Sequence, residues 1–311
     1  MIKYVVKRLL LMIPVLLGVS LLIFFLVNMV PGDPASFALG TDATKEQIEA
    51  FNESIGYYDP LPIRYFNYMK DLLRFDFGTS YISKLPVLDE LADKVPISII
   101  VAFTAILGSL LVGVPLGVLS AVKQYSLWDI IPTSLAICLA SAPSFWLGLL
   151  LMLQFSLKMQ LLPSFGVEEP GWYILPTLTL VAIYGSNQMR QTRSSMLETI
   201  RQDYIRTVRS KGATERVVIW RHALKNALLP VITAAGNNFG ILLGGAIVTE
   251  TLFSLPGLGS FIVNGVKQKD VPVVMGGTLT LAIMFAFVML AVDIIYAFAD
   301  PRVKARYQKM K

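Results

Sequence analysis

The sequence predicts an all-α, polytopic membrane protein with six transmembrane helices, and two observations support this prediction. The first is composition: 55% of the 311 residues are hydrophobic, 15% are charged, and the mean hydropathy is +0.63, which is too apolar for a soluble protein of this length. The second is that six runs of 20 to 28 residues contain no charged residue. About 20 helical residues cross roughly 30 Å of hydrocarbon. The six runs are residues 9–30, 95–122, 130–157, 170–189, 226–249 and 271–292.

The distribution of Lys and Arg predicts how these helices are oriented. One side has three cations at the N-terminus, one at Lys123, nine in the loop 190–225 and five in the tail 300–311. The other side has nine, of which six lie in the long loop 31–94. Because cytoplasmic loops carry the excess of Lys and Arg and long loops count little, we expect both termini in the cytoplasm. The net charge of +6 is then explained by the excess of Lys and Arg in cytoplasmic segments, and it gives no reason to expect binding of nucleic acid.

This topology divides the chain into three parts. Residues 1–30 form an N-terminal tail and the first span, which we expect to be a retained anchor because it exceeds the apolar region of a signal peptide. Residues 31–94 form an extracytoplasmic helical loop. Residues 95–311 form a core of five spans, which includes the basic loop and the C-terminal tail.

Helix signals in the loop 31–94 predict a small folded cap rather than a linker that tolerates length. Thr44 and Gln47 have the spacing of a capping box, and Gly56 ends the helix that follows. A second helix is expected over residues 62–74, and a third begins near Pro86 and leads into the second span. The loop is acidic, with eleven Asp or Glu residues against six cations.

Small and polar residues within the spans predict two further features. Gly236, Gly240 and Gly244 recur every four residues, as do Gly113 and Gly117, and this spacing favours close packing of helices. Uncharged polar side chains are costly in hydrocarbon and therefore indicate a polar translocation pathway. These polar residues are Tyr184, Asn187, Gln188, Asn237 and Asn238.

Several chemistries find no support in this sequence. The six runs contain no Asp, Glu, Lys or Arg, which disfavours coupling to protons or sodium. No G-x-x-x-x-G-K-[ST] motif is present to hold nucleotide phosphates, and a single histidine, His222, excludes an H-E-x-x-H zinc site. The one cysteine, Cys138, excludes an internal disulfide. We therefore expect a conduit that binds no cofactor or metal of its own and is not an enzyme.

The loop 190–225 concentrates nine cations against three acids around one glycine. An amphipathic helix, with Met196, Ile200, Tyr204 and Val208 on one face, is expected to end at Gly212. A second helix capped by Thr214 would continue to a bend at Pro230. One interpretation is a basic loop that binds anionic lipid, which would require only the positive charge. The apolar stripe and the projecting turn favour a docking site for another protein.

The segment "DYIRTVRSKGATERVVIWRHALKNALLPVIT" resembles the cytoplasmic signature loop of permease subunits in binding-protein-dependent ABC importers of the oligopeptide, dipeptide and nickel group. The resemblance extends to "KRLLLMIPVLLGVSLLIFFLVNMVPGDPA", "FDFGTSY", "ETLFSLPGLGSFIVNGV" and "VDIIYAFADPRVK". Within this group the chain resembles the B-type subunit of oligopeptide and dipeptide permeases. Where the general signature has Glu-Ala-Ala, Arg206, Thr207 and Val208 precede Gly212, as in the peptide and nickel branch.

The resemblance implies the type I ABC importer permease fold and a coupling helix that sits in a cleft of a cytoplasmic ATPase. The docking residues carried over are Tyr204, Arg206, Thr207, Arg209, Lys211, Gly212 and Ala213. It also implies a region that gates the outer side or contacts the binding protein, which contains Glu250, Phe253, Pro256, Gly257 and Gly259.

The implied partners are a homologous second permease, two ATPase subunits that use ATP and Mg²⁺, an extracytoplasmic binding protein and lipid. The implied location is a bacterial or archaeal plasma membrane. Peptides are the favoured substrate, and nickel or another small solute is the alternative within the group. A self-sufficient channel or ion-coupled carrier, and a membrane scaffold without a pathway, are alternatives of other classes.

Overall fold

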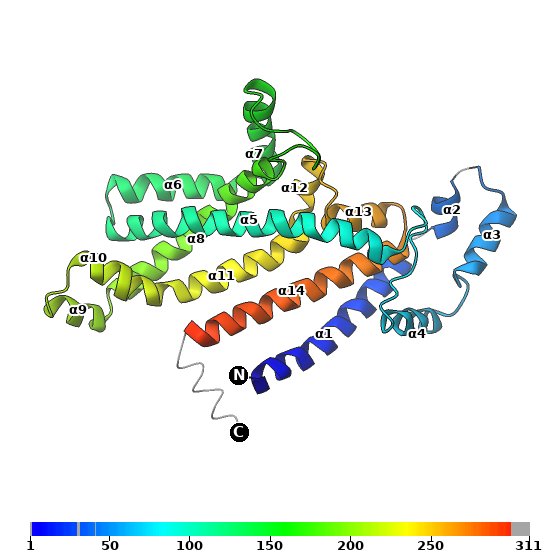
Figure 1. Ribbon diagram of the computed structural model, residues 1–311, viewed down its shortest axis with the longest axis horizontal. Helices are drawn as coiled ribbons and strands as arrows, with labels where there is room; N and C mark the ends of the chain where they lie inside the picture. Colours follow the sequence, from blue (N-terminus) through cyan, green and yellow to red (C-terminus); the bar gives the residue numbers. More distant parts are fainter. Residues whose placement is uncertain (1, 30–31, 41, 300–311) are drawn as a thin grey trace. The chain divides into compact units, whose positions relative to one another are not determined.

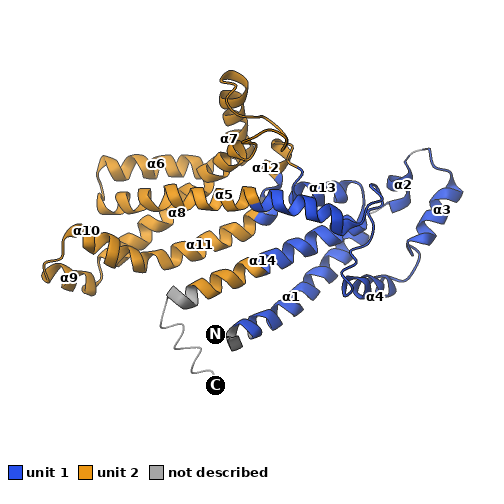
Figure 2. Ribbon diagram, in the orientation of Figure 1, with its two compact units in different colours: residues 1–99, 243–247, 256–286 blue, residues 100–242, 248–255, 287–311 orange. Residues whose placement is uncertain are grey.

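The computed structural model describes residues 2–29, 32–40 and 42–299 (Figure 1). The tail predicted over residues 300–311 lies outside the described residues. Within the described part the protein is helical, and its only β-type pairing is an isolated bridge between Thr79 and Pro86. The all-α prediction is therefore confirmed. The chain divides into two compact units, with unit 1 made of residues 1–99, 243–247 and 256–286 and unit 2 of the remainder (Figure 2).

Unit 1 contains the cap and the ends of two long helices. A core cluster of Val87, Leu91, Leu258 and Val273 joins the N-terminal part of α5 to α13 and α14. The helices that contribute to unit 1 are α1 (Ile2–Met29), α2 (Pro34–Leu39), α3 (Lys45–Ser54), α4 (Leu61–Leu72), the start of α5 (Val87–Val122), α13 (Leu258–Lys267) and most of α14 (Val271–Ala299).

The cap folds where its local signals predict. Thr44 and Gln47 form both hydrogen bonds of the capping box at the start of α3, at 3.3 and 2.9 Å, and Gly56 follows the helix with φ +66°. The second and third predicted helices correspond to α4 and the start of α5. The prediction missed α2, although Asp33 caps it by accepting from the N–H of Ala35 (2.9 Å), and Asn52 of α3 donates to the same carboxylate (2.6 Å).

Asp270 fastens the loop before α5 to the start of α14. Its side chain is buried. The carboxylate accepts hydrogen bonds from the Ser80 hydroxyl (2.5 Å) and from the N–H of Ile82 (3.3 Å). It also accepts from the N–H of Val273 at the beginning of α14 (3.4 Å). A buried carboxylate needs such donors, so the segment "FDFGTSY" is held to the helix that follows Asp270.

Unit 2 holds the remaining helices around a core at its basic end. Its helices are the rest of α5, α6 (Leu127–Ser141), α7 (Ser144–Leu151), the π-helix η1 (Met152–Lys158), α8 (Ile174–Ile200), α9 (Asp203–Ser210), α10 (Glu215–Val217), the π-helix η2 (Val218–Ala223), α11 (Leu224–Gly245) up to residue 242, most of α12 (Ile247–Leu252) and the end of α14.

The predicted count of six transmembrane helices is not confirmed within the described residues. Four helical stretches within the described residues are long and apolar enough to cross a membrane: Arg8–Met29, Val87–Val122, Glu215–Gly244 and Val271–Ile295. The run 130–157 was predicted as one helix, and this is wrong, because α6 and the α7–η1 pair meet at 105°. Pro143 explains the break: it disfavours helical backbone at Ala142, whose ψ is 137°.

The fourth predicted span corresponds to the first half of α8. This helix is 27 residues long but becomes polar from Ser186 onward and continues to Ile200. It therefore falls outside the apolar stretches that could cross a membrane by length and composition. The described chain has four such stretches, or five when the bent pair counts as one span.

Gly113 and Gly117 bring the backbones of α5 and α8 into close contact, as predicted, and Gly236 brings α11 close to a side chain of α14. A Cβ atom on Gly113 would lie 2.6 Å from the carbonyl oxygen of Gly185, and one on Gly117 would lie 2.6 Å from that of Met189. A Cβ on Gly236 would lie 2.0 Å from a methyl carbon of Val292. Real Cβ contacts are longer than these distances, so the approach of α5 to the backbone of α8 requires glycine, whereas at Gly236 the Val292 side chain would have to move.

Candidate functional site

The hairpin formed by α9 and α10 is an exposed basic feature that projects at one end of unit 2 (Figure 2). The sequence predicted one helix from Met196 to Gly212, and this is wrong. Helix α8 ends at Ile200, Gln202 has extended backbone (φ −71°, ψ 148°), and α9 begins at Asp203. An acidic residue in the first turn favours a new helix start there.

A single buried side chain fixes α9 to the rest of the unit. Ile205 is fully buried in a cluster that includes Val118 of α5, Met196 of α8 and Val218 and Ala223 of η2. Complete burial of such a side chain contributes about 1.5–3 kcal/mol. Through this cluster α9 packs against α5, α8 and the segment that leads into α11.

Gly212 makes the turn between the two helices, as predicted. Its φ is +80°, a conformation that side chains with a Cβ rarely adopt, and its N–H donates to the carbonyl of Arg209 (2.9 Å). Thr214 precedes α10 with extended backbone, and its carbonyl accepts from Val217 (2.9 Å), although its side chain makes no capping bond. Pro230 lies inside α11, so the predicted bend at that residue does not end the helix.

The predicted docking residues lie mostly on the surface of this hairpin. Tyr204 is 39% exposed, and its hydroxyl accepts from the side chain of Asn226 in α11 (2.7 Å). Ala213 is half-buried against the core cluster. The exposed members of the predicted set are Tyr204, Arg206, Thr207, Arg209, Lys211 and Gly212.

Ion pairs orient two of the hairpin's arginines. Arg209 binds Glu215 with two hydrogen bonds, from Nε (2.8 Å) and Nη2 (3.2 Å), and so links α9 to α10 across the turn. The hydrogen bond from Arg209 lowers the pKa of Glu215 below its usual range. Arg206 lies 3.6 Å from Asp203 one turn earlier. The arrangement presents a fixed guanidinium plane, a geometry suited to carboxylates or aromatic faces on another protein.

The residues predicted for a translocation pathway occupy different environments. Gln188 is 1% exposed and lies in the α5–α8 contact, where both of its amide atoms lack a hydrogen-bond partner among the described residues. Tyr184 and Asn238 are half-buried, and Asn187 and Asn237 are exposed. Their role in a pathway stays a prediction.

The residues predicted for an outer gate or a binding-protein contact are mainly interior. Glu250 and Phe253 are each 1% exposed, Gly257 and Gly259 are buried, and Pro256 is half-buried. The Phe253 carbonyl accepts from the N–H of Gly166 (3.0 Å). The surface of this segment is formed instead by Thr251 and Ser254. The predicted role stays a prediction.

A buried ion pair that the sequence did not predict lies close to the hairpin. Arg193 of α8 binds Asp129 of α6 with Nε at 2.6 Å and Nη2 at 2.8 Å, and Asp129 is only 4% exposed. The hydroxyl of Ser120 at the end of α5 also donates to this carboxylate, as does the N–H of Tyr125 (2.9 Å). The network ties three helices together just before the chain enters the hairpin. Its one sequence signal was an acidic residue at the border of an apolar run.

Two family models match this chain. Residues 113–305 match the binding-protein-dependent transport system inner membrane component, and residues 1–102 match the N-terminal model for membrane components of the same systems. The chain therefore belongs to the family of binding-protein-dependent transport system inner membrane components. It is a multi-pass membrane protein and the permease subunit of an ABC importer, in which separate subunits hydrolyse ATP. The family predicted from the signature loop is confirmed.

Two similar proteins each match nearly the whole chain. It is 39% identical to the dipeptide transport system permease protein DppB of Alkalihalophilus pseudofirmus, over 98% of this chain and 100% of that protein. It is also 39% identical to the glutathione transport system permease protein GsiC of Salmonella choleraesuis, over 98% of this chain and 99% of that protein.

Solved structures support the fold. An inward-facing structure of the MetNI methionine ABC transporter matches 68% of this chain and 97% of its own chain, with a TM-score of 0.56 at 19% identity. An amino acid ABC transporter matches 67% of this chain and 94% of its own, with a TM-score of 0.54 at 11% identity. These likenesses show the type I ABC importer permease fold that the sequence predicts.

Proposed function

We propose that this chain forms half of the translocation pathway of an importer for di- or oligopeptides. An extracytoplasmic binding protein delivers the peptide, a homologous permease supplies the other half, and two cytoplasmic ATPases bind the permeases. The α9–α10 hairpin is the ATPase-docking element. Both termini face the cytoplasm on this proposal, in agreement with the excess of Lys and Arg on that side.

The construction of the hairpin is the observation that carries the proposal. Its outer surface presents Arg206, Arg209 and Lys211, while Ile205 anchors it to helices of the core. A loop that only held anionic lipid would need charge but no buried anchor. An exposed surface joined to a packed core can transmit displacement, because packed interiors deform little.

The same packing suggests how ATP use would move the permease. Closure of two ATPase subunits would displace α9, and the contacts of Ile205 would pass this displacement to α5, α8 and η2. The Arg193–Asp129 pair would keep α6 and α8 together during the movement. The chain's own part is therefore mechanical, and the energy comes from its partners.

Support for a peptide substrate comes from the relatives. The permeases named for dipeptide and glutathione transport align with nearly the full length of this chain at 39% identity. Both named substrates are short peptides, so the proposed substrate class is short peptides as well.

Reconstitution of the complete importer tests this function. Proteoliposomes that contain both permeases, the ATPases and the binding protein should accumulate a labelled dipeptide only when ATP is supplied. Replacing Arg206 and Arg209 by Glu should lower uptake and ATPase association at least about tenfold, since charged interface residues often contribute 2 kcal/mol or more. Lys158→Glu, an exposed change outside the hairpin, is the matched control. Uptake by this chain alone without ATP would contradict the proposal.

A further inference from the structure

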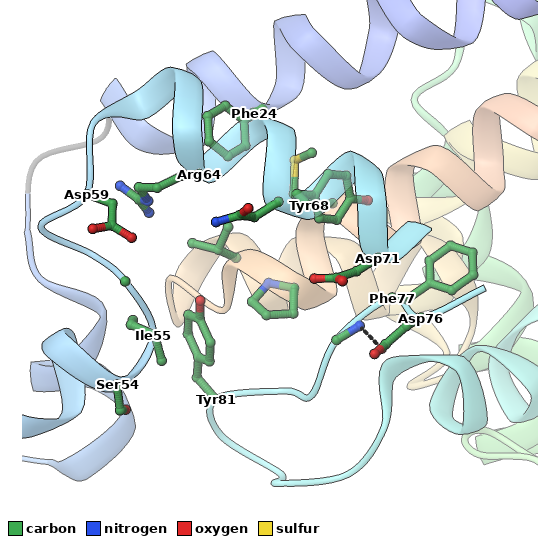
Figure 3. A pocket seen from close by; sticks show the side chains of 16 residues that line it. Phe24, Ser54, Ile55, Asp59, Arg64, Tyr68, Asp71, Asp76, Phe77 and Tyr81 are labelled. Carbon is green, nitrogen blue, oxygen red and sulfur yellow. Dashed lines mark hydrogen bonds between the residues drawn. The ribbon is translucent and has the colours of Figure 1, made fainter. Parts of the chain in front are cut away.

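A partly open cavity between the cap, α1 and the start of α14 in unit 1 has no part in the transport mechanism above. Its volume is about 380 Å³, and it lies between α4, the segment 76–81 and the start of α14 (Figure 3). Pockets for small ligands begin at about 300 Å³, so the cavity is large enough for a small molecule. Its walls combine charged side chains with the aromatic rings of Phe24, Tyr68, Phe77 and Tyr81.

Carboxylates gather at one end of this cavity. Asp71 and Asp76 lie on the side near Phe77, away from Arg64 and Asp59 on the opposite side (Figure 3). Within the described residues, Asp76 accepts one hydrogen bond, from the N–H of Gly78 (2.8 Å), and the carboxylate of Asp71 accepts none. Both groups therefore have acceptor capacity for a cationic ligand.

The other end, where a second cavity begins, is lined by the cations Arg64 and Lys269 and by one carboxylate, Asp59. This cavity has a volume of about 240 Å³, shares Asp59, Arg64 and Val271 with the first, and is also lined by Lys269. The Arg64 guanidinium lies 5.2 Å from the centre of the Tyr57 ring and donates to the Tyr57 carbonyl at 3.4 Å. These contacts hold Arg64 at the junction of the two cavities.

The backbone at Lys269 is unusual for a lysine. Its φ is +53°, and its ammonium lies 5.4 Å from the centre of the Phe37 ring. This left-handed residue ends α13, where the N–H of Asp270 donates to the carbonyl of Gly265 (2.9 Å) and the N–H of Lys269 donates to that of Val266 (3.3 Å). Positive charge is therefore brought to this end of the cavities by the turn that ends α13.

The tyrosines of the first cavity add no charge of their own. Burial raises the pKa of Tyr81 to about 12 and raises that of Tyr68 above its usual range. Their rings thus act as neutral walls, and the electrostatic difference between the two ends comes from the Asp, Arg and Lys side chains.

We propose that the two adjoining cavities bind a short zwitterionic peptide, with its amino group at Asp71 and Asp76 and its carboxylate at Arg64 and Lys269. The aromatic and apolar walls would accept side chains of differing size. This inference rests on the proposed function and topology, which place the cap on the side from which peptide arrives. The site would hold cargo before it reaches the spans.

Binding of trialanine to the assembled transporter, in nanodiscs and without the binding protein, tests the inference. Titrations followed by saturation-transfer NMR would compare trialanine with its N-acetyl and C-amide derivatives. Each derivative should bind at least about tenfold more weakly, because each loses a charge-assisted contact. Equal binding of all three peptides, or no binding of trialanine, would overturn the proposal.

Substitutions assign each end. The double variant of Asp71→Asn and Asp76→Asn should weaken trialanine binding and remove its advantage over N-acetyl-trialanine. The double variant of Arg64→Gln and Lys269→Gln should remove the advantage over the amide. Glu46→Gln and Lys70→Gln, exposed changes outside both cavities, should retain both preferences. A loss of affinity for all three peptides without any change in preference would overturn the assignment of the ends.

Two further measurements distinguish a failure of the cavity inference from a failure of the proposed transport function. ATP-driven uptake of trialanine by the complete importer tests the proposed function alone. If uptake occurs but the cavity variants bind trialanine as the wild type does, only the cavity inference fails. If the variants lose affinity for the binding protein while trialanine binding is unchanged, the surface is a protein contact and the inference also fails.

Discussion

Two of the arginine–carboxylate pairs in unit 2 are each joined by two hydrogen bonds but have opposite surroundings. Arg193 and Asp129 join α8 to α6, with side chains that are 25% and 5% exposed. Arg209 and Glu215 join α9 to α10, with side chains that are 39% and 63% exposed. Both guanidinium groups bind through Nε and Nη2. The difference in burial indicates that the Arg193–Asp129 pair holds helices together, whereas the Arg209–Glu215 pair shapes an exposed surface.

The largest effect should follow from breaking the buried pair. Arg193→Leu leaves the Asp129 carboxylate buried without its cation, which typically costs about 3–5 kcal/mol. We expect a marked fall in the thermal stability of the purified complex in detergent. Arg190→Leu, an exposed change three residues earlier on α8, should change stability little.

The double variant of Arg193→Leu and Asp129→Leu sharpens this comparison. Replacing both partners removes the unpaired charge, so stability should recover relative to Arg193→Leu. A double variant no more stable than the single one would show that the pair's hydrogen bonds to Ser120 and Tyr125, rather than charge balance, hold the helices.

A backbone change in the hairpin should have an intermediate effect. Gly212→Val places a β-branched residue at φ +80° and should cost about 1–2 kcal/mol locally. A Cβ there would meet no atom within 4 Å, so conformation rather than crowding is the cause. Gly212→Asn should be tolerated better, because Asn adopts this conformation more readily. ATPase association and hydrogen exchange over α9 would measure both variants, and equal behaviour of Val and Asn would contradict the explanation.

Breaking the exposed pair separates its structural role from docking. Arg209→Gln and Glu215→Gln remove the same ion pair, and each should change stability by less than about 1 kcal/mol. If Arg209 contacts the ATPase, only Arg209→Gln should weaken association. Equal losses from the two variants would mean that the pair serves only to shape the turn.

Local signals made much of this molecule predictable. The capping box at Thr44 and Gln47 and the turn at Gly212 involve residues a few positions apart, and both are present in the structure. The Arg193–Asp129 pair was missed because its partners are 64 residues apart and meet only after α6 packs on α8. No local pattern contains that information.

Two helices were predicted wrongly because a continuous side-chain pattern was taken to mean a continuous helix. The run 130–157 contains no charge, yet Pro143 divides it, because the residue before a proline avoids helical backbone. At the hairpin, the apolar stripe continues from Met196 to Val208 although the helix breaks at Gln202. The apolar residues thus keep their helical spacing in the sequence although the backbone between α8 and α9 is not helical.

The smallest expected effect is the pH dependence of the exposed pair. Because Arg209 lowers the pKa of Glu215 in the folded protein, the pair contributes stability above the usual pKa of a glutamate and loses it as pH falls through the lowered value. Carboxyl-carbon NMR of Glu215 should show a midpoint below that of an exposed glutamate, and Arg209→Gln should restore the ordinary midpoint. Solvent screens this pair, so the thermal stability of the complex should barely change over the same pH range. A large loss of stability there would place the acid-sensitive group elsewhere and remove the contrast between the two pairs.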